Sequence, residues 1–259
     1  MEKIPLLNTE VLSITESQLL EKLKAELQDD KKCGNGVIIT PNVDHLVKLQ
    51  KDKEFYKCYC EAEYLICDSK ILYLCSKLLK KSFPEAIPGS SFFTHFYEYN
   101  KSNEYCRIFL LGGMDGVADQ ARKRINEKMG REIVVGSFSP SFGFEKKQSE
   151  NELIYKMIEA SKANVVLVGV GAPKQEKWIF AHKDRMCNVK IWMALGATID
   201  FEAGNIKRAP KIFQKLALEW LYRMWCEPKR MFKRYICDDL AFFIYFFKQL
   251  CGVYKNPWA

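Results

Sequence analysis

Histidine, paired cysteines and long apolar runs are all scarce in this chain of 259 residues. Its three histidines are widely separated, so a histidine-based zinc site is not expected. The ten cysteines show no Cys-x-x-Cys spacing, and the first residues are too polar for a secretory signal, so we expect reduced thiols in a cytosolic protein. The nearest candidate for a membrane span, LAFFIYFF at 240–247, is far shorter than the roughly 18 residues required.

Positive charge is abundant, but it is concentrated in the last fifth of the chain. Residues 206–259 hold 11 Lys or Arg and 4 Asp or Glu, which is +7 of the total net charge of +8. Such asymmetry indicates an anionic partner: a membrane surface, a phosphorylated ligand or a nucleic acid. We therefore predict a domain over residues 1–205 and a basic, aromatic, helical appendage over residues 206–259.

Six short segments rich in Val, Ile and Leu alternate with amphipathic segments along the first part. The predicted strands cover 36–40, 64–67, 107–113, 132–138, 164–171 and 190–196. Predicted helices lie near 16–27, after 43, after 68, and at 116–129, 149–161 and 174–182, and a loop rich in Ser, Pro and Gly spans 137–143. This order predicts an α/β fold, a Rossmann-like parallel sheet with helices on both faces. In such folds ligands bind at the carboxyl ends of the strands.

Polar residues and glycines gather at those predicted strand ends. They are Thr40, Asn42, Asp68, Gly112, Gly113, Gly169, Gly171, Lys174, Gln175, Glu176, Thr198 and Asp200. Glycines let backbone amides approach a phosphate, and helix N-termini favour anions. We expect Lys174, Gln175 and Glu176, on the first turn of one helix, to face the same cleft.

Taken singly, these residues also fit purely structural roles. Gly112 and Gly113 fit a tight turn, since they do not complete a dinucleotide-binding fingerprint. Asp68 fits a cap for the helix that follows it, and Asp200 fits a turn. Thr40–Asn42 fits the start of a helix. Their concentration at one edge of the sheet favours a ligand site.

Four stretches are similar to motifs of a known family: TPNVDHL, GAPKQEKWI, GATIDFEAGNIKRAP and LEWLYRMWCEPKRMFKRY. With them the chain, over about residues 5–250, resembles the WecG/TagA/CpsF family of bacterial glycosyltransferases. The resemblance implies an inverting transferase that needs neither metal nor other cofactor. It would move N-acetylmannosamine or a related sugar from a UDP-sugar to a polyprenyl-diphosphate-linked acceptor at the cytoplasmic face of the bacterial plasma membrane.

The resemblance also implies roles for individual residues. Asp68 matches the proposed general base, and Thr40 and Asn42 match positions near the acceptor. Gln175 matches a position beside the sugar or diphosphate. Substrate-binding positions, on the nucleotide side or around the diphosphate, would be Gly112, Gly113, Gly171, Lys174, Glu176, Asp200, Arg223 and Arg230.

This chain departs from the family pattern near the acceptor and sugar pocket. The family usually has Asp-Gly where Asp68-Ser69 stands here. An arginine is replaced by Ala86 and an aspartate by Ser91. These changes bear on the identity of the donor sugar more than on the class of reaction.

The basic appendage admits two interpretations. Arg223, Arg230 and Arg234 are spaced to share a helical face, although Pro228 indicates a break between them. A solvated basic face is the simpler explanation. The interleaved aromatic residues favour a helix lying on an anionic lipid surface, with Arg223 and Arg230 reaching the diphosphate.

Two other readings compete with a membrane-associated glycosyltransferase. A nucleotide-binding or nucleic-acid-binding protein would use the basic tail to hold phosphates, but no recognised binding module accompanies the tail, so we expect no nucleic-acid partner. An inactive scaffold of the same fold stays open because of the departures near Pro88. The sequence leaves open whether the chain forms a homo-oligomer.

Overall fold

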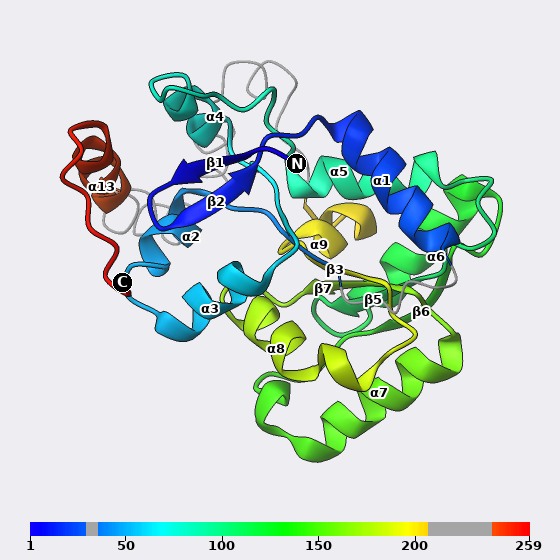
Figure 1. Ribbon diagram of the computed structural model, residues 1–259. Coiled ribbons are helices and arrows are strands. Elements are labelled where there is room, and N and C mark those ends of the chain that lie inside the picture. The colour runs from blue at the N-terminus through cyan, green and yellow to red at the C-terminus, as the bar shows by residue number, and fades with distance from the viewer. Residues whose placement is uncertain (30–35, 207–239) are drawn as a thin grey trace.

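A six-stranded parallel sheet forms the centre of the computed structural model, which describes residues 1–29, 36–206 and 240–259. The strand order is β4-β3-β8-β7-β5-β6 (Figure 1). The strands are β3 (Gly36–Ile39), β4 (Tyr64–Leu65), β5 (Ile108–Gly112), β6 (Val134–Phe138), β7 (Val165–Gly169) and β8 (Ile191–Ala194). Each strand lies within a segment predicted from the apolar runs, so the predicted α/β parallel sheet is confirmed.

Helices cover both faces of this sheet, as predicted. One face carries α1 (Glu16–Gln28), α5 (Gly89–Tyr99), α6 (Val117–Met129) and α9 (Thr198–Ala203). The other carries α2 (Val43–Lys48), α3 (Lys53–Glu61), α7 (Gln148–Ser161) and α8 (Lys174–His182). In Figure 1, α7 and α8 lie on the opposite side of the sheet from α1 and α6. The short α4 (Lys70–Ser76) follows β4.

Alternation along the strands produces two hydrophobic cores. Val166 and Val168 of β7 face the core with α7 and α8, whereas Val165 and Leu167 face the core with α1 and α6. All four side chains are fully buried. Successive strand residues point to opposite faces, so a strand covered on both faces must be apolar throughout. This is why continuous apolar runs, rather than alternating ones, predicted the strands.

The first helix begins as its sequence predicts. The Thr15 side chain accepts from the backbone amide of Gln18 at 3.3 Å, and the Gln18 side chain accepts from the Thr15 amide at 3.0 Å. These reciprocal bonds form a capping box, which satisfies two amides that the first helical turn would leave without partners.

An N-terminal hairpin, β1 (Lys3–Leu6) and β2 (Thr9–Leu12), was not predicted. It lies beside α13 (Leu240–Leu250) (Figure 1). Gln249 joins the two segments, accepting from the Leu7 amide at 2.9 Å and donating to the Pro5 carbonyl at 3.0 Å. The end of α13 therefore packs against the β1–β2 hairpin.

The described helix of the appendage, α13, is mostly apolar, and Lys248 is its one charged residue. Arg223, Arg230 and Arg234 lie outside the described residues, so the predicted boundary near residue 206 stays a prediction. Among the described helices, none is both long and apolar enough to cross a bilayer.

Candidate active site

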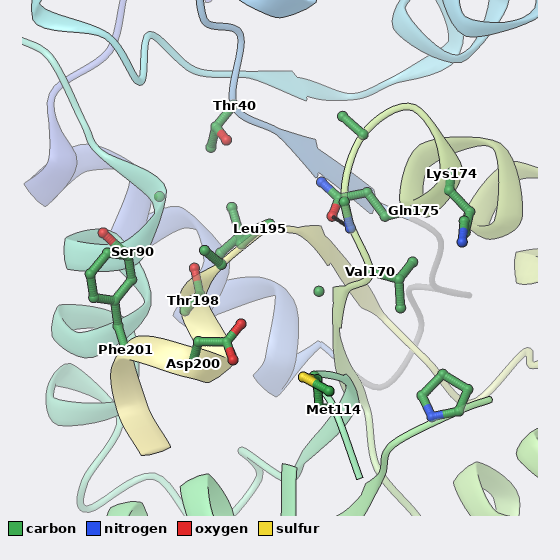
Figure 2. A pocket seen from close by; sticks show the side chains of 18 of the residues that line it. Thr40, Ser90, Met114, Val170, Lys174, Gln175, Leu195, Thr198, Asp200 and Phe201 are labelled. Carbon is green, nitrogen blue, oxygen red and sulfur yellow. Dashed lines mark hydrogen bonds between the residues drawn. The ribbon is translucent and has the colours of Figure 1, made fainter. Parts of the chain in front are cut away.

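A cavity of about 1110 Å³ opens at the edge of the sheet where all six parallel strands end. Each strand or the loop that follows it contributes to the lining, from Thr40 after β3 to Leu195 after β8. Ligand pockets usually measure roughly 300–1,000 Å³, so this cavity lies just above the usual range. Figure 2 shows the cavity with Thr40, Ser90, Thr198, Asp200 and Phe201 toward one side and Val170, Lys174 and Gln175 toward the other.

Asp68 lines this cavity at the end of the segment that contains β4. Its Oδ1 accepts a hydrogen bond from the backbone amide of Gly89 at 2.6 Å. The following helix, α4, is capped by Ser69, whose Oγ accepts from the amide of Ile71 at 3.2 Å. Asp68 therefore does not cap the helix that follows it, and a capping role there does not explain the residue.

Thr40 and Asn42 line the same cavity, beyond the end of β3. Asn42 is the N-cap of α2, because its Oδ1 accepts from the amide of His45 at 3.0 Å. The start of a helix, considered above as the structural role of Thr40–Asn42, is thus confirmed for Asn42. The residue both starts a helix and faces the cavity.

The loop between β7 and α8 brings Gly171 to the cavity, and the first turn of α8 brings Lys174 and Gln175. Gly171 has a φ of +87°, a left-handed conformation that glycine adopts without strain. Its amide donates to Oε1 of Gln175 at 3.1 Å. The Lys174 ammonium lies 3.8 Å from Glu145 and 4.9 Å from the ring centroid of Phe142. Gly171 therefore sets the turn, and its amide positions the side chain of Gln175.

Glu176 does not line the cavity, although the sequence predicted that it would face the cleft with its two neighbours. Its side chain is fully buried and accepts from Nε2 of Gln175 at 2.8 Å. Successive helical residues are turned by about 100° around the helix axis, so three in a row span about 200° and do not all point into one cleft. Burial raises the pKa of the Glu176 carboxyl to about 7.

The two adjacent glycines at the end of β5 also differ in position. Gly113 lines the cavity, but Gly112 does not. Gly112 has a φ of +141°, and a Cβ there would lie 2.4 Å from the carbonyl oxygen of Gly169 on the neighbouring strand. Gly112 therefore permits close approach of β5 and β7. Asp200, in the first turn of α9, lines the cavity as expected.

Some lining residues were not singled out from the sequence. Ser139, Ser141 and Phe142 come from the loop after β6, and Gly89 and Ser90 come from the start of α5. Phe142 is 94% exposed at the rim of the cavity. A Ser- and Gly-rich loop directly after a parallel strand was the signal for the first group, since every such loop opens at this edge.

The three histidines have partners of their own. His45 is hydrogen-bonded to the Tyr59 hydroxyl at 2.6 Å, and His182 to the Tyr155 hydroxyl at 2.7 Å. His95 pairs with Glu16. Within the described ranges, no three His, Cys, Asp or Glu side chains are grouped as metal ligands would be. Arg223 and Arg230, predicted to meet the diphosphate, lie outside those ranges.

Comparison with known proteins gives consistent matches along the chain. The profile of the glycosyl transferase WecG/TagA/CpsF family matches residues 4–256, which include every strand end described above. Two similar proteins come from Staphylococcus aureus, and both are named N-acetylglucosaminyldiphosphoundecaprenol N-acetyl-beta-D-mannosaminyltransferase. The protein of strain MRSA252 is 28% identical over 229 residues, and that of strain NCTC 8325 / PS 47 is 27% identical. Each alignment covers 88% of this chain and 87% of the relative. The chain therefore belongs to the WecG/TagA/CpsF family of glycosyl transferases.

Proposed function

We propose that this chain transfers N-acetylmannosamine, or a closely related sugar, from a UDP-sugar to N-acetylglucosamine linked to a polyprenyl diphosphate. The names of the Staphylococcus aureus relatives support the transferred sugar and the acceptor. The UDP donor, inversion at the anomeric carbon and independence from metal follow from the family resemblance of the sequence motifs.

One observation carries this proposal: Asp68 and the Gly171–Gln175 loop line the same cavity. They come from opposite sides of the central strands, since β3 and β8 separate β4 from β7. A carboxylate and diphosphate-binding groups must share one space if an acceptor is to attack a sugar attached to UDP. The cavity volume of about 1110 Å³ accommodates both substrates.

In the proposed reaction, Asp68 acts as the general base. The acceptor hydroxyl oxygen forms a bond to the anomeric carbon while its proton passes to the Asp68 carboxylate. The bond from the anomeric carbon to the UDP oxygen breaks, and its electron pair stays on the diphosphate. A well-placed general base contributes roughly 10²–10⁴ in rate.

The leaving diphosphate gathers negative charge, which cations and amide donors would stabilise. Lys174 and Gln175, on the first turn of α8, are placed for this role, where the helix dipole also favours an anion. We assign Asp200 and Gly113 to the nucleotide side, and Thr40 and Asn42 to the acceptor side. Arg223 and Arg230 would complete the diphosphate site from the basic segment.

We also propose that α13 docks on the cytoplasmic face of the membrane, where a polyprenyl-linked acceptor resides. The inner face of α13 is anchored by Phe242 and Phe246, which are buried. Its outer face exposes Phe243, Ile244 and Phe247 by 47%, 61% and 67%. These apolar side chains follow the basic segment 206–239 in the sequence, and such a combination suits an anionic lipid surface.

The function is tested by incubating the purified full chain with radiolabelled UDP-sugars and a polyprenyl-diphosphate-linked N-acetylglucosamine acceptor. We expect label to pass to the lipid with release of one UDP per sugar, and UDP-N-acetylmannosamine to be the best donor of a panel. No transfer from any UDP-sugar, together with salt-sensitive binding to DNA, would instead support a nucleic-acid-binding protein.

A further inference from the structure

Glu176 is a buried acid in direct contact with a cavity residue. Its side chain is fully buried, and its Oε1 accepts from Nε2 of Gln175 at 2.8 Å. Among the described residues, its Oε2 has no hydrogen-bond partner. A buried carboxyl group with an unsatisfied oxygen costs folding free energy, so its presence beside the site needs an explanation.

Two contacts fix which way the Gln175 carboxamide points. The backbone amide of Gly171 can only donate, so the atom that faces it at 3.1 Å must be the oxygen of Gln175. The nitrogen of the carboxamide must then face Glu176, which accepts from it. Gly171 and Glu176 therefore hold opposite ends of the same planar group, and a flipped amide would lose both bonds.

This orientation leaves Gln175 with a donor for the cavity. A carboxamide nitrogen carries two hydrogens, and the contact with Glu176 uses one of them. Gln175 lines the cavity (Figure 2), so its second N–H is the donor that remains for a ligand. A donor attracts an anionic oxygen, whereas a carbonyl oxygen turned the same way would repel it.

We propose that Glu176 is a positioning residue for sugar transfer: it holds the Gln175 carboxamide so that one N–H donates to an anionic oxygen of the UDP diphosphate. The inference rests on the proposed function, because it takes UDP as the occupant of the cavity. Glu176 itself does not touch the substrate and acts through Gln175.

The charged groups around Glu176 are compatible with this role. On α2, the Lys48 ammonium lies 2.8 Å from Asp44 and 3.4 Å from the Ala172 carbonyl oxygen, so its hydrogen bonds go to those groups. On α3, burial raises the pKa of both Cys58 and Tyr59, and the negative charge of Glu176 raises it further. The carboxyl of Glu176 keeps an oxygen that accepts from Gln175 whether or not it carries a proton.

The proposal is tested with Glu176→Leu and Glu176→Gln in the full chain, using UDP alone as the probe. Leucine fills similar space but cannot accept, so we expect it to weaken UDP binding about tenfold, the loss expected for one positioned hydrogen bond. Glutamine keeps an accepting oxygen, and we expect it to bind UDP nearly as well as the wild type. The Tm of Glu176→Leu should not fall, because leucine removes a buried group with an unsatisfied oxygen.

Two further measurements distinguish positioning from a general structural effect. If Glu176 acts through Gln175, the double variant Gln175→Leu/Glu176→Leu should bind UDP no more weakly than Gln175→Leu alone. The KM for the lipid-linked acceptor should stay unchanged in Glu176→Leu. If Glu176→Leu instead raised the KM for the acceptor and left UDP binding unchanged, the acceptor's diphosphate would lie at Gln175, and the assignment to UDP would be overturned.

Three results would overturn the inference alone: wild-type UDP affinity in Glu176→Leu, equal losses in Glu176→Leu and Glu176→Gln, or additive losses in the double variant. A wild-type chain that does not bind UDP would instead overturn the proposed function, and this inference with it.

Discussion

The carboxylate of Asp68 and the backbone amide of Gly89 are joined by a hydrogen bond of 2.6 Å. Gly89 is the first residue of α5, so the N-terminus of this helix holds the carboxylate of Asp68, which lies beyond β4. A Cβ at Gly89 would lie 2.9 Å from Cδ2 of Leu195, which leaves little room for any other residue. Both Asp68 and Gly89 line the cavity, and the contact therefore orients the proposed base within it.

We predict that Gly112→Ala destabilises the fold strongly. A Cβ there would meet the Gly169 carbonyl oxygen at 2.4 Å, and the φ of +141° is unfavourable for alanine. Strain and steric overlap together should lower the free energy of unfolding by roughly 3–5 kcal/mol. Gly116→Ala is the matched control: its φ is +74°, but nothing lies within 4 Å of a Cβ, so its loss should be about 1 kcal/mol. Equal losses in urea denaturation would contradict the packing argument.

The free energy of unfolding should depend on the protonation of Glu176. Burial raises the pKa of this carboxyl from its usual 4.5 to about 7 in the folded state. Between these values the folded state binds more protons than the unfolded state, so stability falls as pH rises. The stabilisation that the protonated carboxyl gives the folded state is fully present below pH 4.5 and is lost above about pH 7. The free energy of unfolding should fall by about 3 kcal/mol over this range.

Glu176→Gln provides the comparison, because glutamine does not titrate while Asp44, Lys48, Cys58 and Tyr59 stay in place around it. Chemical denaturation of both proteins across this pH range measures the effect. The wild type should lose stability relative to the variant as pH rises. A difference that stays constant from acid to neutral pH would show that Glu176 titrates normally.

Removal of divalent metal should leave sugar transfer unchanged. In the proposed mechanism, the leaving diphosphate is stabilised by Lys174, by Gln175 and by the arginines of the basic segment, so no metal ion is required. The full chain is treated with EDTA, and the initial rate is measured with and without added Mg²⁺. A rate that falls with EDTA and recovers with Mg²⁺ would refute metal independence.

The outer face of α13 should control binding to membranes. We expect the triple variant Phe243→Ser/Ile244→Ser/Phe247→Ser to bind vesicles of phosphatidylglycerol and phosphatidylcholine at least about tenfold more weakly, since apolar area no longer enters the lipid. Leu153→Ser, on α7, is the control, because Leu153 is likewise 47% exposed. Unchanged sedimentation of the triple variant with vesicles would exclude α13 as the docking surface.

The sheet and its functional edge could be predicted because strands buried on both faces leave a strong signal. Continuous apolar runs predicted the six strands, and the polar residues that follow them predicted which edge of the sheet carries the cavity. The β1–β2 hairpin, α3 and α5 were not predicted. The start of α5 at Pro88-Gly89 resembles a loop, and its N-cap makes no side-chain hydrogen bond that a motif could reveal.

Side-chain direction within the site was harder to predict than position along the chain. Lys174 and Gln175 reach the cavity while Glu176 turns into the core, a difference set by rotation about the axis of α8. Similarly, Gly112 and Gly113 are adjacent, but one faces β7 and the other the cavity. Such distinctions depend on neighbouring strands and helices, which local sequence does not specify.

In the proposed mechanism, Asp68 removes the proton from the acceptor in the cavity that binds UDP. The most direct test is single-turnover transfer of radiolabelled sugar by Asp68→Asn beside the wild type, with UDP affinity measured on both. Asparagine keeps an oxygen that can accept from Gly89, so folding and UDP binding should be preserved. We predict a loss in rate of roughly 10²–10⁴. A variant that binds UDP and transfers sugar at the wild-type rate would show that Asp68 is not the general base.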